Sequence, residues 1–132
     1  MDIFETFATD PKLELEGALL PLDSKGAKVL VARAGNDNYI RLLRKKLEAA
    51  NLDLASTSKE DEAAAEALFI EVQAQTILLG WEGLKFKGDT LPYSVENARI
   101  LLSVKDFRRK IEALSQNFDN FKAKAEKALG NG

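Results

Sequence analysis

The chain contains neither cysteine nor histidine among its 132 residues. Without cysteine there can be no disulfide, no zinc thiolate site and no cysteine nucleophile. Without histidine the usual general base near neutral pH is missing, which excludes Ser-His-Asp and Cys-His catalytic arrangements. No glycine-rich segment has the spacing of a phosphate-binding loop. The sequence therefore predicts a protein that is not an enzyme, with no catalytic residues, no metal site and no cofactor.

The chain also lacks a surplus of basic residues and any long apolar run. Lys and Arg total 19 against 21 Asp and Glu, for a formal net charge of -2, whereas nucleic-acid binding usually depends on a basic surface. No run approaches the roughly 18 apolar residues that span a bilayer. The first residues do not have the basic and then apolar pattern of a signal peptide. We therefore expect no nucleic-acid partner, no membrane partner and a location in the cytoplasm.

One basic cluster leaves a different function open. Arg41, Arg44, Lys45 and Lys46 lie close together in a predicted helix. Such a cluster could contact nucleic acid, although a solvated helix face is its commoner role. A nucleic-acid-associated regulator therefore stays an alternative.

Length and patterning predict one domain over residues 1–132. Hydrophobic residues make up 45% of the chain, which is enough for a single core in a domain of this size. Two short apolar runs flank the turn-forming segment Asp23–Gly26, so a β-hairpin is expected within residues 17–33. Pro21 confines its first strand to a sheet edge. The helical part covers residues 37–129.

The predicted fold class is mainly α, with four to five helices packed around a central apolar helix and a small N-terminal β-hairpin. Polar capping residues mark most of the helix starts. Asn36 or Asp37 precedes a helix over 38–50, and Ser58 precedes the central helix over 59–79, which Gly80 ends. After a connection with a turn at Lys87–Gly88, two more helices start after Ser94 and Ser103, and the last closes at Gly130.

The last predicted helix carries an apolar seam with steps of three and four residues. Such a seam is typical of coiled-coil or helix-in-groove docking. The same stripe could instead pack on the central helix as ordinary core, which is the commoner use. The seam consists of Val104, Phe107, Ile111, Leu114, Phe118, Phe121, Ala125 and Ala128. The candidate partner-binding residues are Phe107, Ile111, Leu114, Phe118 and Phe121.

Two stretches resemble known phage proteins. Residues 7–39, with Phe7–Asp10, Leu15–Gly17, Val31–Asn36 and Asn38-Tyr39, are similar to the opening of many small phage tail-region proteins. The later stretch resembles tail assembly chaperones of long-tailed (siphophage-type) bacteriophages, in which a Gly-Trp-x-Gly turn and a Gly-containing turn precede an aromatic-Ser-x-Glu-Asn helix start. Its matching residues are Gly80–Leu84, Gly88, Leu91–Ser94, Glu96–Ala98 and Leu101-Leu102. Phe86-Lys87 stand where that family often has acidic residues.

This resemblance implies a function and partners. Tail assembly chaperones bind and solubilise the tape measure protein and help to recruit subunits of the major tail tube protein. They act in the host cytoplasm, are absent from the finished virion, and could form homo-oligomers along their partner. The alternative is a structural minor tail or head–tail completion protein that stays in the virion.

Overall fold

The computed structural model describes residues 1–123. Within that range the chain forms six α-helices, a short 3₁₀-helix (η1) and five β-strands. No helix in this range is long and apolar enough to cross a membrane. In chain order the elements are α1 (Ile3–Phe7), α2 (Pro11–Glu16), β1 (Ala18–Pro21), β2 (Lys28–Val31), α3 (Asp37–Ala50), α4 (Lys59–Thr76), β3 (Leu78–Glu82), β4 (Lys85–Phe86), β5 (Asp89–Thr90), α5 (Val95–Leu102), α6 (Lys105–Gln116) and η1 (Phe118–Phe121).

A three-stranded antiparallel sheet makes the fold mixed α/β, so the prediction of a mainly α fold was wrong. Its order is β1-β2-β3, and β3 comes from the segment expected to end the central helix. Gly80 lies inside this strand opposite Leu30, and Trp81 lies opposite Val29. A short apolar run such as Ile77–Leu79 fits either a helix end or a strand, and here pairing with β2 decides for the strand.

The N-terminal hairpin is present, and it forms two of the three strands. β1 and β2 lie within the predicted 17–33 range, and β1 with Pro21 is a sheet edge as expected. β2 is the central strand, and Val29 and Val31 are fully buried. A second, two-stranded sheet joins β4 and β5. Its turn lies at Lys87–Gly88, as predicted, and both residues have positive φ.

Capping explains most of the helix starts. The side chain of Asn36 accepts a hydrogen bond from the Tyr39 backbone N–H (2.9 Å), and Ser58 and Ser94 cap α4 and α5 in the same way. Helix α3 begins one residue before the predicted 38–50 range and ends where predicted. Helix α4 ends at Thr76 rather than at 79, because the following residues enter β3. There are six α-helices in residues 1–123 rather than four to five.

The last predicted helix differs most from its expected form. Ser103 is not its cap, because the Ser103 hydroxyl donates to the carbonyl of Ile100 and Val104 precedes the first turn. Helix α6 ends at Gln116, after which the Asn117 side chain accepts from the Asp119 N–H and starts η1. The expected end at Gly130, with Ala125 and Ala128 of the seam, lies outside the described residues.

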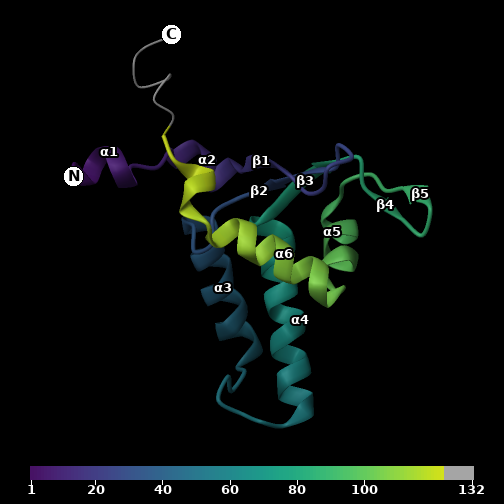
Figure 1. Cartoon of the computed structure of the whole chain (residues 1–132). Helices are drawn as coiled ribbons and strands as arrows, with labels where there is room; N and C mark the ends of the chain where they lie inside the picture. Colours follow the sequence, from purple (N-terminus) through teal and green to yellow (C-terminus); the bar gives the residue numbers. More distant parts are fainter. Residues whose placement is uncertain (124–132) are drawn as a thin grey trace.

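The sheet forms one end of the molecule, and the long helices extend from it (Figure 1). Helices α3 and α4 are packed side by side, and α6 crosses them close to the sheet (Figure 1). Short α1 projects away from the body at the N-terminal end (Figure 1). The core between sheet and helices consists mainly of Val29, Val31, Ile70, Ala74, Ile77, Leu78, Leu102 and Ile111.

Candidate functional site

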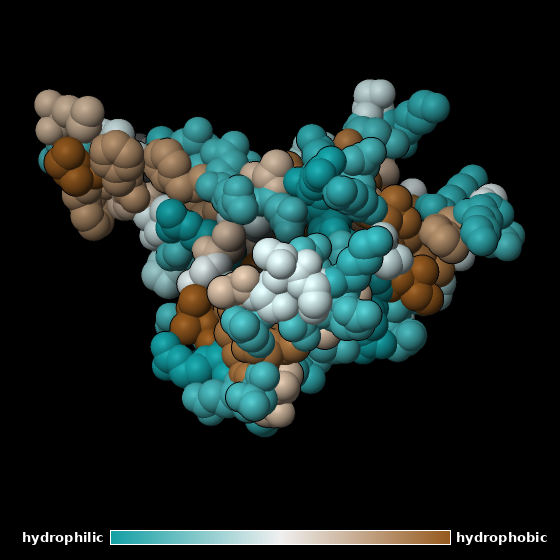
Figure 2. Space-filling model, turned by 90° about the horizontal axis from the view of Figure 1, so that it is seen from below, coloured by the Kyte–Doolittle hydropathy of each residue, from teal (hydrophilic) through white to brown (hydrophobic). Residues whose placement is uncertain are grey.

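The start of the chain exposes large apolar side chains. Asp2 caps α1 by accepting a hydrogen bond from the Glu5 N–H (3.1 Å), and this helix has no buried residue. The exposed fraction is 79% for Phe4 and 65% for Ile3. Figure 2 shows hydrophobic atoms gathered on this projecting end. We call the exposed residues Met1, Ile3, Phe4 and Phe7 the N-terminal apolar surface.

Helix α1 is joined to the body through the segment after α6. The Phe7 ring lies 5.6 Å from the Phe118 ring. An isolated antiparallel bridge joins Thr9 to Lys122, and the Asp10 N–H donates to the Phe121 carbonyl (2.8 Å). The N-terminal apolar surface is therefore held on one side and open on the other. Contiguous exposed apolar surface of this kind commonly marks an interaction site.

The five residues of the seam that were predicted to contact a partner differ in how deeply they are buried. Ile111 and Phe121 are fully buried, so neither can touch a partner in this conformation. Phe107 and Leu114 are partly buried and pack against the core. Phe118 is partly buried beneath Phe7. The seam of α6 thus packs mostly inward, and only its end, at Phe118, adjoins an exposed apolar surface.

Sequence reasoning missed Ile3 and Phe4 as candidates. The available signal was three large apolar residues, Ile3, Phe4 and Phe7, within five positions before the Asp10-Pro11 helix start. Nothing in that pattern shows that the helix projects from the body. Its exposure depends on where the segment after α6 places Phe118.

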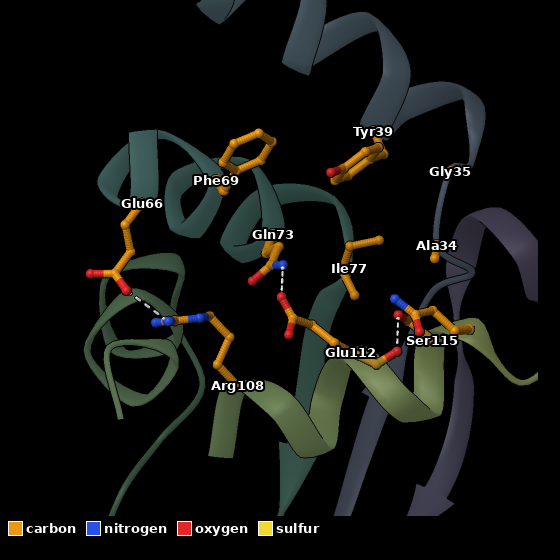
Figure 3. A pocket seen from close by; sticks show the side chains of 11 residues that line it. Ala34, Gly35, Tyr39, Glu66, Phe69, Gln73, Ile77, Arg108, Glu112 and Ser115 are labelled. Atoms are coloured by element: carbon orange, nitrogen blue, oxygen red, sulfur yellow. Dashed lines mark hydrogen bonds and ion pairs between the residues drawn. The ribbon is translucent and has the colours of Figure 1, made fainter. Parts of the chain in front are cut away.

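A pocket of about 350 Å³ opens between α3, α4 and α6. Its walls bear apolar side chains, including Tyr39, Phe69 and Ile77, together with polar groups (Figure 3). The full lining is Ala34, Gly35, Tyr39, Glu66, Phe69, Gln73, Ile77, Arg108, Glu112, Ser115 and Gln116.

Two polar pairs organise this pocket. Arg108 Nη2 lies 2.8 Å from Glu66 Oε2, and Gln73 Nε2 donates to Glu112 Oε2 (2.8 Å). Burial raises the pKa of the Tyr39 hydroxyl, and the nearby Glu112 carboxylate raises it further. Both effects disfavour a tyrosinate anion here. The pocket is therefore a partly enclosed site whose polar groups come from α3, α4 and α6.

The charged clusters have ordinary structural positions. Arg41, Arg44 and Lys45 are exposed on α3, and Arg108 is bound by Glu66 and the Leu102 carbonyl. Among residues 1–123, no group of three or more acidic side chains could hold a metal ion.

The residues that resemble the tail assembly chaperone pattern form one structural unit. The Trp81 ring contacts the Tyr93 ring edge-on at a centroid distance of 4.9 Å. Trp81 Nε1 donates to the Leu91 carbonyl (2.7 Å), and the Tyr93 hydroxyl donates to the Leu78 carbonyl (2.8 Å). Ser94 caps α5. These residues connect β3 to α5 and contribute stability rather than chemistry.

A protein-family model described as "YdaY prophage protein" matches residues 34–131, most of the chain. The chain belongs to this family. Its membership in the YdaY family confirms the expected phage or prophage origin. The matched region includes the whole Trp81–Tyr93 unit and the pocket, whereas the N-terminal apolar surface precedes it. We found no significant match among curated proteins or solved structures.

Proposed function

We propose that this YdaY-family protein is a phage tail assembly chaperone. In this role it binds and solubilises the tape measure protein and helps to recruit subunits of the major tail tube protein, without catalysing a reaction. It acts in the cytoplasm of the bacterial host and is absent from the mature virion. The observation that carries the proposal is the N-terminal apolar surface, where Phe4 is 79% exposed.

This surface favours partner binding because exposing large apolar side chains to water is unfavourable in free energy. Each large apolar side chain that moves from water into an interface contributes about 1.5–3 kcal/mol. Phe4 and Ile3 gain little of this kind from the fold of residues 1–123, because α1 has no buried residue and both side chains are mostly exposed. An apolar helix face of this type suits a helical or aggregation-prone partner chain. Prophage membership and the chaperone-like residues 80–102 support the choice of partner.

Co-expression with the tape measure protein of the same phage tests this function. We expect the wild-type chain to keep the tape measure protein soluble and to co-purify with it. Ile3→Asp combined with Phe4→Asp should lower the co-purified amount at least tenfold, because charges would replace apolar contacts. Phe118→Asp should have a smaller effect, since Phe118 is only partly exposed.

The control is Leu54→Asp, which replaces a 54% exposed apolar residue in the loop between α3 and α4. That loop lies at the opposite end of the molecule from the sheet (Figure 1), so this variant should bind like the wild type. If a folded wild-type chain neither solubilises nor binds the tape measure protein, the chaperone function is wrong. Finding the protein in purified virions would instead support a structural minor tail or completion protein.

A further inference from the structure

The pocket between α3, α4 and α6 contains a polar group that the fold leaves unsatisfied. Gln73 is 8% exposed, and its Oε1 has no hydrogen-bond partner among residues 1–123. A buried acceptor without a partner destabilises a protein by about 1–3 kcal/mol. In Figure 3 this oxygen points toward the Arg108 side of the pocket, while the amide nitrogen faces Glu112. The pocket therefore offers an acceptor that a bound donor would satisfy.

The charge balance of the pocket favours a cation as that donor. Arg108 is paired with Glu66 (2.8 Å) and also donates to the Leu102 carbonyl. Glu112 accepts from the Gln73 amide, but it makes no ion pair within 4 Å in the described part of the chain. One carboxylate thus remains without a compensating positive charge. An anion would be repelled here, whereas a cation would gain Glu112 and Gln73 Oε1 together.

The apolar walls define the rest of the ligand. The Phe69 and Tyr39 rings and the Ile77 side chain line the same space (Figure 3). A ligand with an aliphatic chain and a positively charged end group would cover these walls and place its charge next to the Glu112 carboxylate. A volume of about 350 Å³ lies at the lower end of the range typical of ligand sites. This size suits one or two side chains rather than a large cofactor.

We propose that this pocket binds a lysine or arginine side chain of a protein partner. The protein nature of the partner rests on the proposed function, whereas the chemistry rests on the pocket alone. The pocket lies near the N-terminal apolar surface, since Gln116 lines the pocket and Phe118, two residues later, contacts Phe7. One partner segment can therefore place a basic residue in the pocket and apolar residues on α1. Because Gln73 Oε1 is enclosed, the side chains around it must separate on binding, as interface rotamers commonly do.

A titration followed by NMR tests the pocket without the tape measure protein. The probes are N-acetyl-lysine methylamide and N-acetyl-norleucine methylamide, which has a similar aliphatic chain but no charge. For the lysine probe we expect saturable shifts of the Gln73 side-chain amide and the Ala34 and Ser115 backbone amides. The norleucine probe should bind at least tenfold more weakly. Raising NaCl to about 0.5 M should weaken only the lysine probe, because salt screens the charge interaction.

Glu112→Gln should lower the affinity for the lysine probe to that for the norleucine probe, since it keeps an acceptor for Gln73 but removes the charge. The matched control, Glu82→Gln, removes an exposed carboxylate on β3 and should change nothing. The proposal is overturned if no saturable shift occurs, if both probes bind equally, or if Glu112→Gln keeps the preference. If the Glu112→Gln variant does not fold, the salt dependence of lysine-probe binding to the wild-type chain tests the proposal instead. Failure of the co-expression experiment would not affect this result, so the two proposals fail separately.

Discussion

At the scale of single residues, two tyrosines have different structural roles although burial raises the pKa of both hydroxyls. The Tyr93 hydroxyl donates to the Leu78 carbonyl (2.8 Å), and its ring packs on Trp81. The Tyr39 hydroxyl lines the pocket and makes no hydrogen bond within residues 1–123. Tyr93 therefore holds β3 to the segment before α5, whereas Tyr39 faces a site.

Replacing each tyrosine by phenylalanine should affect the stability of the protein differently. We expect Tyr93→Phe to lower the free energy of unfolding by about 1 kcal/mol, because one partly buried hydrogen bond is lost. Tyr39→Phe should change it by less than about 0.5 kcal/mol. Urea unfolding followed by fluorescence measures both. Equal losses for the two variants would contradict the assigned role of the Tyr93 hydroxyl.

Tyr93 should also make the free energy of unfolding depend on pH in the alkaline range. Burial raises the pKa of Tyr93, so the unfolded chain releases this proton at a lower pH than the folded chain. The free energy of unfolding is then unaffected below the ordinary tyrosine pKa of about 10 and falls as the pH rises past it. Tyr93→Phe should reduce this fall. Unfolding curves between pH 8 and about 11 measure it, and an unchanged slope would contradict the prediction.

At the scale of elements, the join between α2 and the sheet depends on one glycine. Gly17 ends α2 with φ of 98° and ψ of 151°, a region that is nearly restricted to glycine. A Cβ atom at this position would lie 2.9 Å from Leu30 Cγ. Gly26, in the turn between β1 and β2, shares the φ of 98° but has open space around it. Substituting each of these two glycines therefore measures the cost of the positive φ separately from the cost of the steric conflict with Leu30.

We expect Gly26→Ala to lower the free energy of unfolding by about 1 kcal/mol, from the positive φ alone. Gly17→Ala should cost about 1–3 kcal/mol more, because Leu30 on the central strand must also shift. Thermal or urea unfolding of both variants measures the difference. If Gly17→Ala is no more costly than Gly26→Ala, then the contact with Leu30 does not restrict this position.

At the scale of the whole molecule, an apolar end that stays largely exposed in residues 1–123 favours association. Met1 is 92% exposed and Phe7, the most enclosed of the four residues on that surface, is still 50% exposed. In the absence of another partner, two copies could cover this surface together. The homo-oligomer that the resemblance to tail assembly chaperones implies would depend on such contacts.

Sedimentation velocity tests self-association directly. We expect the free wild-type chain to associate as its concentration rises from about 1 to 100 μM, and Phe4→Asp to reduce this at least tenfold. Leu54→Asp should associate like the wild type. A wild-type chain that stays monomeric over the whole range would show that this surface does not bind itself, and the homo-oligomer would be excluded under these conditions.

The local sequence determined much of this protein. The caps at Asn36, Ser58 and Ser94, the edge position of Pro21 and the Lys87–Gly88 turn were all predictable, because each depends on hydrogen bonds or φ preferences within a few residues. The phage origin was likewise indicated by the resemblance of residues 80–102 to tail assembly chaperones, and the family match confirms it. Composition alone showed that the chain has no cysteine or histidine side chain.

Only the tertiary structure decided the rest. Residues 78 and 79 could continue a helix or form a strand, and the long-range pairing of β3 with β2, in which Gly80 lies opposite Leu30, made them a strand. The seam of the last helix could bind a partner or the core, and packing against the sheet and α4 buried Ile111 fully. The projection of α1 and the unsatisfied Gln73 oxygen likewise depend on residues distant in the chain. Local preferences fix where elements begin and end, but the surface that stays exposed is determined by which elements pack together.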